Sequence, residues 1–228
     1  MRVAFCVRFK RRVMVILAFS AGTVALFAAL ALNVDERQII AMNAAVRTVV
    51  AGVQSSSLHS LFSALSCAGS VAVLGPMAAV AIFWLWRRGA SDRSALAGVV
   101  SMSSVLVTFT LKAIFHRARP LGAGAFPELG YSFPSGHSLN TMAIGVTVAY
   151  VSYREGLVPR RAVGAAVIFS LLVGVSRVYL DVHWATDVIG GWSVGAVIAT
   201  ACALFYEWPH STRDLAPTSC DDVERSNV

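Results

Sequence analysis

Apolar runs separated by short polar stretches dominate this sequence. A helix needs roughly 20 mostly apolar residues to cross a lipid bilayer. Six candidate crossings lie at about residues 13–32, 66–86, 95–115, 138–151, 163–180 and 188–206. The pattern therefore predicts an all-α integral-membrane bundle of about six transmembrane helices, with residues 1–228 forming a single domain.

Two segments depart from this pattern. Residues 36–65 mix charged, polar and apolar positions, which favours an interfacial helix and loop over a bilayer crossing. Residues 207–228 are polar and predict a flexible tail. The first apolar run follows a basic stretch and is longer than the core of a normal signal peptide. We expect it to remain as a membrane anchor, with a cleaved signal peptide as the alternative.

Composition supports a membrane protein, with 57% hydrophobic and 14% charged residues. The net charge of +7 could indicate nucleic-acid binding, but the arginines lie in small groups beside apolar runs and do not form one polar face. We therefore expect no nucleic-acid partner. The four cysteines have neither CxxC nor CxxH spacing, so they indicate neither a zinc site nor a disulfide framework.

The distribution of positive charge predicts the orientation in the inner membrane. With six spans, most Lys and Arg residues near span ends share one side, which is expected to be cytoplasmic. These residues are Arg2, Arg8, Lys10, Arg11, Arg12, Arg87, Arg88, Arg93, Arg154, Arg160, Arg161, Arg213 and Arg225. Both termini are then cytoplasmic, and the loops after the third and fifth spans are extracytoplasmic.

Three polar clusters interrupt the apolar chain at 112–120 (KAIFHRARP), 134–137 (PSGH) and 176–187 (SRVYLDVHWATD). With six spans, all three belong to the extracytoplasmic ends of spans three to six. Ionisable groups at membrane level are costly unless they are paired or hydrated, so their concentration there indicates function.

The first cluster contains two cations seven residues apart, Lys112 and Arg119. Two helical turns would align them, although Pro120 makes a continuous helix doubtful. A bound phosphate would relieve their repulsion. Alternatively, Lys112 extends to the lipid headgroups while Arg117 and Arg119 contact anionic lipid.

The second cluster, PSGH, is typical of a helix start. Ser135 can cap the helix, and Gly136 lets its backbone amide approach an oxyanion. His137 adds a group that can protonate a leaving oxygen. The alternative is an ordinary helix cap without a catalytic role.

In the third cluster, His183 and Asp187 are four residues apart and can meet on one helix face. A carboxylate that holds one ring N–H leaves the other nitrogen free to attack phosphorus. The alternatives are an ordinary helix-start pair or a metal site with His137 and Asp181, which the neighbouring cations disfavour.

Together, the clusters read Lys112, six residues, Arg119-Pro120; Pro134-Ser135-Gly136-His137; and Ser176-Arg177, five residues, His183, three residues, Asp187. This three-part pattern closely resembles the type 2 phosphatidic acid phosphatase superfamily, which includes lipid phosphate phosphatases and haloperoxidase-like proteins. The resemblance covers about residues 66–206.

The resemblance implies that His183 is the nucleophile, Asp187 is its partner and His137 is the acid that protonates the leaving group and later helps water attack. The phosphate-binding residues that it implies are Lys112, Arg119, Ser135, Gly136 and Arg177. No metal or other cofactor is expected. His116, Arg117 and Asp181 fall outside the defining positions, and we expect them to make local ion pairs or headgroup contacts.

The function implied by the resemblance is hydrolysis of a membrane lipid phosphate or diphosphate through a phosphohistidine. Undecaprenyl diphosphate is the leading substrate because the site is expected to face outward. Phosphatidylglycerol phosphate, phosphatidic acid and lipid A phosphates are further candidates. The alternatives are a lipid phosphotransferase that uses the same phosphohistidine and a non-catalytic protein that binds or transports lipid.

Overall fold

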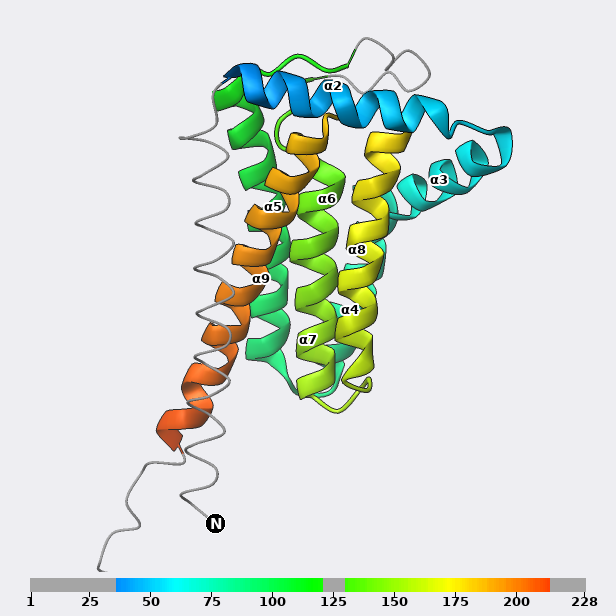
Figure 1. Cartoon of the computed structure of the whole chain (residues 1–228). Coiled ribbons are helices and arrows are strands. Elements are labelled where there is room, and N and C mark those ends of the chain that lie inside the picture. The colour runs from blue at the N-terminus through cyan, green and yellow to red at the C-terminus, as the bar shows by residue number, and fades with distance from the viewer. Residues whose placement is uncertain (1–35, 121–129, 214–228) are drawn as a thin grey trace, which may run out of the picture.

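The computed structural model describes residues 36–120 and 130–213, and these residues contain helices but no strands. Figure 1 shows a bundle with one helix lying across its end. The first expected span at 13–32 and most of the expected tail lie outside the described residues. The helices are α2 (Glu36–Gly52), α3 (Ser56–Ala68), α4 (Val71–Arg87), α5 (Ser91–Phe115), α6 (Gly136–Asn140), η2 (Thr141–Gly145), α7 (Val146–Arg154), α8 (Arg161–Tyr179) and α9 (Ala185–Arg213).

The lengths and apolarity of the helices support part of the expected span count. Three are long and apolar enough to cross a membrane: α5, α8 and the Ala185–Glu207 part of α9. A fourth candidate is the pair α3 and α4, if the two helices form one span with a 44° bend. The expected crossing at 138–151 corresponds to α6, η2 and α7, which follow one another in line (Figure 1) but include a π-helical segment.

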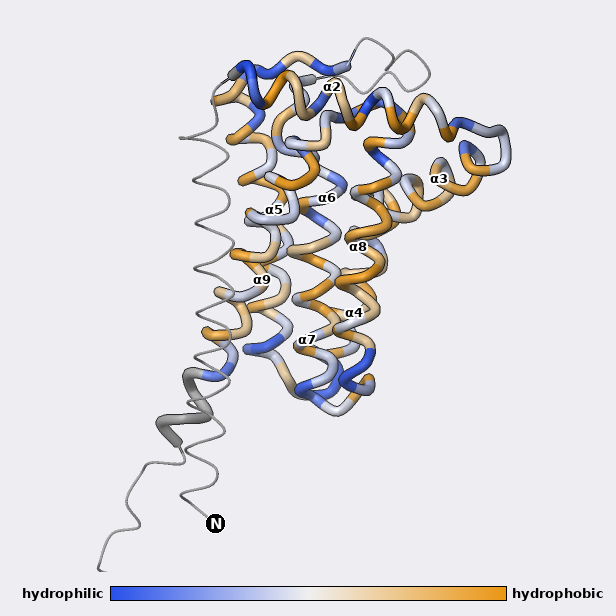
Figure 2. Tube along the Cα trace, viewed as in Figure 1, coloured by the Kyte–Doolittle hydropathy of each residue, from blue (hydrophilic) through white to orange (hydrophobic). Residues whose placement is uncertain are grey.

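The segment expected to lie at an interface, residues 36–65, forms α2 and most of α3. Helix α2 runs across the ends of α8 and α9, whereas α4 to α9 run along the bundle (Figure 1). Polar and apolar positions are mixed along α2, while the central parts of α4 and α8 are mainly apolar (Figure 2). Ser55 begins α3 by accepting a hydrogen bond from the Leu58 amide at 3.3 Å.

The rod formed by α6, η2 and α7 supplies much of the buried core. Leu139, Ala143 and Val151 have no solvent exposure. Helix α9 packs against this rod through glycines one turn apart: an added Cβ would lie 2.7 Å from the Ser135 carbonyl oxygen at Gly191 and 2.5 Å from the Leu139 carbonyl oxygen at Gly195. These positions accommodate no side chain, so the helix backbones approach closely.

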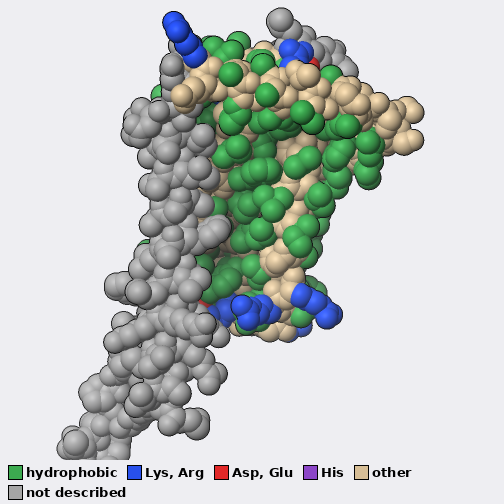
Figure 3. Space-filling view, in the orientation of Figure 1, with side chains coloured by type: hydrophobic (Ala, Val, Ile, Leu, Met, Phe, Trp, Pro, Cys, Tyr) green, Lys and Arg blue, Asp and Glu red, His purple; other side chains and the backbone are tan. Residues whose placement is uncertain are grey.

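Ion pairs and a hydrogen bond link the helices at the end of the bundle opposite α2. Arg154 of α7 forms an ion pair with Glu207 of α9. The Tyr206 hydroxyl donates to Glu155 Oε1 at 2.7 Å, and Arg93 of α5 pairs with the same carboxylate at 3.5 Å. Lys and Arg side chains gather at this end of the visible face (Figure 3). The clustering agrees with the expected charge bias, while the compartment that this end faces stays a prediction.

Candidate active site

The turn after α5 brings the two cations of the first cluster together. Helix α5 ends at Phe115, and His116 adopts a left-handed conformation with φ of 44° that turns the chain. Lys112 Nζ and Arg119 Nη2 both donate to the Tyr131 carbonyl oxygen, at 2.7 and 3.4 Å. Lys112 and Arg119 are therefore neighbours, but through a turn and not through a continuous helix.

His183 lies in the short connection between α8 and α9, and Asp187 lies on the first turn of α9. Both side chains are buried. His183 Nδ1 is 3.4 Å from Asp187 Oδ2, so the expected pairing is present. His183 itself precedes the helix by two residues, because the chain first makes a turn at Asp181, where φ is 53°.

The other nitrogen of the imidazole faces a cation. Arg119 Nη1 lies 3.2 Å from His183 Nε2. A guanidinium can only donate hydrogen bonds, so Nε2 is the acceptor and the proton of the neutral ring belongs on Nδ1, toward Asp187. This tautomer leaves a lone pair on Nε2.

Burial lowers the pKa of His183 from its ordinary value of 6.5 to about 4. The hydrogen bond to Asp187 opposes this effect, while the positive charges of Arg119 and Arg177 add to it. The imidazole is therefore neutral at neutral pH, which is the form that a nucleophile requires.

Asp187 is held by several donors besides the histidine. The Trp184 amide donates to Oδ2 at 2.9 Å, and the Ser132 hydroxyl donates to the same oxygen. Ser132 Oγ also lies 3.4 Å from His183 Nδ1. Since Ser132 gives its proton to Asp187, it can accept the Nδ1 proton and support the same tautomer.

The PSGH segment joins the site through its backbone. The Ser135 amide donates to the Asp187 carbonyl oxygen at 2.9 Å. Ser135 precedes α6, as expected, but its side chain does not cap the helix, because its Oγ accepts from Ser138 Oγ at 3.1 Å. A Cβ at Gly136 would lie 3.1 Å from the Thr108 methyl group, so its close approach is to α5. His137 is half-buried on the first turn of α6.

Arg177 is almost fully buried in the last turn of α8. Its guanidinium Nη1 donates to Ser66 Oγ of α3. Its carbonyl oxygen accepts from the amides of Val182 and His183, at 3.2 and 3.3 Å. Arg177 thus positions the connection that carries His183 and places a positive charge near the imidazole.

Sequence reasoning left the role of Arg117 open, and the structure gives it a central contact. Arg117 Nη1 lies 2.9 Å from Asp187 Oδ1 and 2.7 Å from Thr186 Oγ1. The ion pair expected for Arg117 is therefore made with the carboxylate of the candidate site. The position of Arg117 in the sequence, two residues before Arg119, does not predict this contact, because the contact depends on the turn at His116.

Helix α2 contributes site contacts that the sequence analysis did not identify. Asn43 Nδ2 donates to Thr186 Oγ1 at 3.1 Å, and Arg47 pairs with Asp181 at 2.7 Å. Asn43 and Arg47 are four residues apart, so they share one face of the helix. The four-residue spacing could have indicated a shared polar face. It did not stand out, because polar and apolar residues are mixed throughout residues 36–65.

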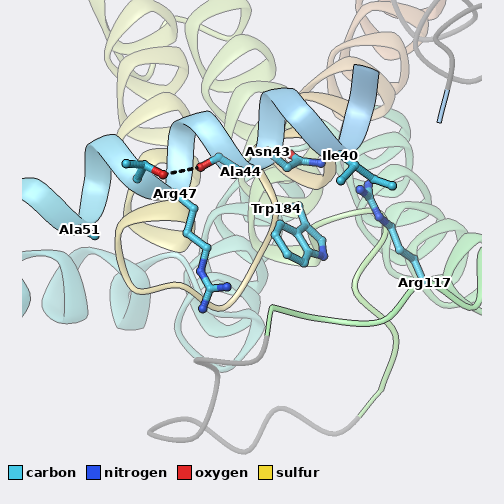
Figure 4. Close-up of a pocket in the computed structure, with 8 residues that line it drawn as sticks. Ile40, Asn43, Ala44, Arg47, Ala51, Arg117 and Trp184 are labelled. Atoms are coloured by element: carbon cyan, nitrogen blue, oxygen red, sulfur yellow. Dashed lines mark hydrogen bonds between the residues drawn. The ribbon is translucent and has the colours of Figure 1, made fainter. Parts of the chain in front are cut away.

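A cavity of about 470 Å³ lies between α2 and these residues (Figure 4). Its lining residues are Ile40, Asn43, Ala44, Arg47, Thr48, Ala51, Arg117 and Trp184. Within the described ranges, no three His, Cys, Asp or Glu side chains gather so that they could hold a metal ion. Asp181, considered as a ligand at first, pairs with Arg47.

Comparison with known proteins identifies relatives of this arrangement. Residues 93–211 match the model of the PAP2 superfamily. Phosphatidylglycerophosphatase B of Bacillus subtilis is 38% identical over 97 residues, which cover 41% of this chain and 48% of the relative. An undecaprenyl-diphosphatase of Sulfolobus acidocaldarius is 41% identical over 69 residues, which cover 30% of this chain and 31% of the relative. The chain thus spans less than half the length of these two relatives.

A solved structure extends the similarity over most of the fold. The crystal structure of a transmembrane PAP2-type phosphatidylglycerolphosphate phosphatase from Bacillus subtilis superposes with a TM-score of 0.76 at 25% identity. The match covers 82% of this chain and 96% of that one. With its apolar helices, this similarity makes the chain a multi-pass membrane protein.

Proposed function

Because the chain belongs to the PAP2 superfamily, we propose that it is a membrane phosphatase that hydrolyses a lipid phosphate or diphosphate through a phosphohistidine at His183. The observation that carries the proposal is the environment of this imidazole. It is buried and neutral, its Nδ1 faces Asp187, and its Nε2 faces a guanidinium. A phosphate held by that guanidinium would present its phosphorus to the Nε2 lone pair.

In the first chemical step, Nε2 attacks phosphorus and the bond from phosphorus to the leaving oxygen breaks. His137 protonates that oxygen, which leaves as the lipid alcohol or lipid monophosphate. The imidazole becomes a cation as the N–P bond forms, and Asp187 stabilises this charge through the Nδ1 proton.

In the second step, His137 accepts a proton from water as the water oxygen attacks the phosphohistidine. The N–P bond breaks, inorganic phosphate leaves, and the neutral imidazole is restored. The chain's own residues supply acid, base and nucleophile, so we propose that turnover requires no metal or cofactor.

Binding of the reacting phosphate is assigned to the cations and the helix start near His183. Phosphoryl transfer depends mainly on in-line positioning and on stabilising the charge of the equatorial oxygens. The residues proposed for this role are Lys112, Arg119, Ser135, Gly136 and Arg177. The neighbouring positions of Lys112 and Arg119, and the burial of Arg177, support it.

The site is proposed to face the extracytoplasmic side of the inner membrane, with both termini in the cytoplasm, and to receive its substrate from the bilayer. The gathering of Lys and Arg at the opposite end of the bundle supports this orientation. Undecaprenyl diphosphate is the leading substrate, and the names of both relatives support a lipid phosphate ester or diphosphate.

The test is phosphate release by the purified full-length protein in detergent containing EDTA. Undecaprenyl diphosphate, phosphatidylglycerol phosphate and phosphatidic acid are compared, with His183→Ala as the control. We expect release from at least one lipid without any acceptor alcohol, and none from the variant. Failure of the wild-type protein to release phosphate from any of them would overturn the proposal.

A further inference from the structure

Helix α2 and the turn after it hold the chain just before His183. Arg47 Nη2 and Nε donate to Asp181 Oδ2 at 2.7 and 3.2 Å, and Figure 4 shows Arg47 extending from α2. Asp181 has a left-handed φ of 53°, which is uncommon for residues other than glycine, and the ion pair supports this turn. Beyond the end of α2, the Gln54 side-chain amide donates to the Tyr179 carbonyl oxygen at 2.9 Å. The end of α8 and the turn that follows it are therefore attached to the α2 segment.

Asn43 of α2 holds the chain just after His183. The Thr186 amide donates to Asn43 Oδ1 at 3.3 Å, and Asn43 Nδ2 donates to Thr186 Oγ1 at 3.1 Å. A backbone N–H can only donate, so it determines which way the Asn43 side-chain amide is turned. Both residues are buried, with 4% of each exposed. Water therefore cannot readily replace these hydrogen bonds if the side chain of Asn43 is removed.

The Thr186 amide needs an outside acceptor because it lies at the start of α9. The Trp184 carbonyl oxygen accepts from the Val188 amide at 3.3 Å, so Trp184 is the residue that caps the first turn. The first amides of a helix have no acceptor within the helix, and the capping residue usually supplies one from its own side chain. An indole can only donate, so Asn43 caps α9 from another helix.

The contact at Asn43 continues to the catalytic carboxylate through Arg117. Thr186 Oγ1 accepts from Arg117 Nη1 at 2.7 Å, and the same nitrogen donates to Asp187 Oδ1 at 2.9 Å. Figure 4 shows the Arg117 guanidinium directed toward α2. Asn43 thus orients the Thr186 hydroxyl, the hydroxyl orients the guanidinium, and the guanidinium orients the carboxylate that faces His183 Nδ1.

We propose that α2 positions His183 and Asp187 for the reaction, and that Asn43 is the main positioning residue on this helix. The inference rests on the proposed function, because it concerns the same imidazole. Phosphoryl transfer depends on in-line geometry, so a small displacement of the nucleophile slows the chemical step even when the substrate still binds. Asn43 acts on the reaction through Thr186 and not through contact with the phosphate.

The experiment measures kcat and KM for farnesyl monophosphate, using the full-length protein in detergent. We expect Asn43→Ala to lower kcat about tenfold, as for the loss of buried hydrogen bonds, and to leave KM and the Ki of inorganic phosphate within about twofold. Arg47→Gln should lower kcat only about two- to threefold, because its ion pair is partly exposed. Gln38→Ala is the matched control, since it removes an exposed side-chain amide from the same helix, and it should keep the wild-type kcat.

Substitutions of Thr186 separate positioning from a general loss of stability. Thr186→Val keeps the shape of the side chain but removes the hydroxyl between Asn43 and Arg117, whereas Thr186→Ser keeps the hydroxyl. We expect kcat to fall about tenfold in Thr186→Val and less than threefold in Thr186→Ser. The double variant Asn43→Ala/Thr186→Val should lose much less than the product of the single losses, because the two residues act through one contact. All assays are run well below the lowest midpoint temperature of thermal unfolding.

The outcomes distinguish the positioning role from the proposed function. A wild-type kcat in Asn43→Ala, or losses that multiply fully in the double variant, would overturn the role of Asn43 while leaving the phosphatase intact. A raised KM and phosphate Ki with an unchanged kcat would also overturn it, because Asn43 would then act on binding. If Asn43→Ala does not fold, equal kcat values in Thr186→Val and Thr186→Ser decide against the role. Wild-type protein that releases no phosphate from any lipid would instead overturn the proposed function itself.

Discussion

Arg117 Nη1 lies 2.9 Å from Asp187 Oδ1, on the opposite carboxylate oxygen from the one that faces His183. The carboxylate is buried, so the cation compensates for its removal from water. Arg117 therefore orients the Asp187 carboxylate while its other oxygen faces His183 Nδ1.

Replacing Arg117 should slow formation of the phosphoenzyme. We expect Arg117→Gln to lower kcat about 10- to 100-fold, because one partner of a buried ion pair is removed. Farnesyl monophosphate is a suitable substrate, since its reacting phosphate carries only a lipid alcohol as leaving group. Arg117→Lys should recover part of the rate, and an Arg117→Gln protein with wild-type kcat would contradict this role.

Ser132 offers a milder test of the same arrangement. Ser132→Ala removes the hydroxyl that donates to Asp187 and lies near His183 Nδ1. We expect kcat to fall about tenfold with KM unchanged, as for the loss of one buried hydrogen bond that orients a catalytic group. Ser132→Thr keeps the hydroxyl and should lose less. An unchanged kcat in Ser132→Ala would show that Asp187 alone orients the imidazole.

The lowered pKa of His183 predicts the pH dependence of the reaction. The neutral imidazole is the nucleophile, so its activity is present above a pKa of about 4 and is lost as the pH falls through that value. The rate of phosphoenzyme formation should therefore be insensitive to this group between pH 5 and 7. A rate of phosphoenzyme formation that falls as the pH drops through about 6.5, in wild type and in His137→Ala alike, would contradict the shift.

The same shift predicts a contribution to stability with a defined sign. His183 binds its proton at about 6.5 when unfolded and at about 4 when folded, so the unfolded state holds more protons between these values. Stability should fall as the pH drops from about 6.5 to about 4. The midpoint temperature of thermal unfolding, followed by tryptophan fluorescence, should fall less steeply with decreasing pH in His183→Gln than in the wild-type protein.

His137 can be tested through the leaving group. If it protonates the leaving oxygen, His137→Ala should lower kcat about 10²- to 10⁴-fold for a lipid monophosphate with an alkoxide leaving group. The loss should be much smaller for p-nitrophenyl phosphate, whose phenolate leaves without protonation. Equal losses for both substrates would contradict the role of a general acid.

The close contact between α9 and α6 predicts a local intolerance to side chains. An added methyl group at Gly195 would lie 2.5 Å from a backbone oxygen, so Gly195→Ala should destabilise the protein by about 1–3 kcal/mol. Gly98→Ala and Gly164→Ala are matched controls, because nothing lies within 4 Å of the added atom in α5 or α8. Thermal unfolding in detergent measures the difference.

The apolar pattern predicted the helices that carry the site because each run is long, and the spacing of His183 and Asp187 predicted their contact because local geometry determines it. The position of α2 was harder to predict from the sequence. Charged, polar and apolar residues are mixed along it, and its role depends on partners such as Asp181 and Thr186, more than 130 residues away along the chain.

The contacts of Arg117 and Ser132 required the tertiary structure as well. Arg117 reaches Asp187 only because His116 turns the chain after α5. Histidine adopts a left-handed conformation more often than most residues, but this weak preference does not single out His116 in the sequence. Ser132 precedes PSGH in a segment rich in glycine and apolar residues, and nothing in its spacing distinguishes it from an ordinary loop serine. These contacts depend on the folding of three segments onto one another.

The glycine contacts between α6 and α9 also affect how the site responds to its surroundings. Spanning helices tilt when the hydrocarbon thickness of the bilayer changes. Because the backbones approach closely at Gly191 and Gly195, we expect α6 and α9 to tilt together, so that Ser135 keeps its hydrogen bond to the Asp187 carbonyl oxygen. The geometry around the nucleophile should then depend little on the lipid composition of the membrane.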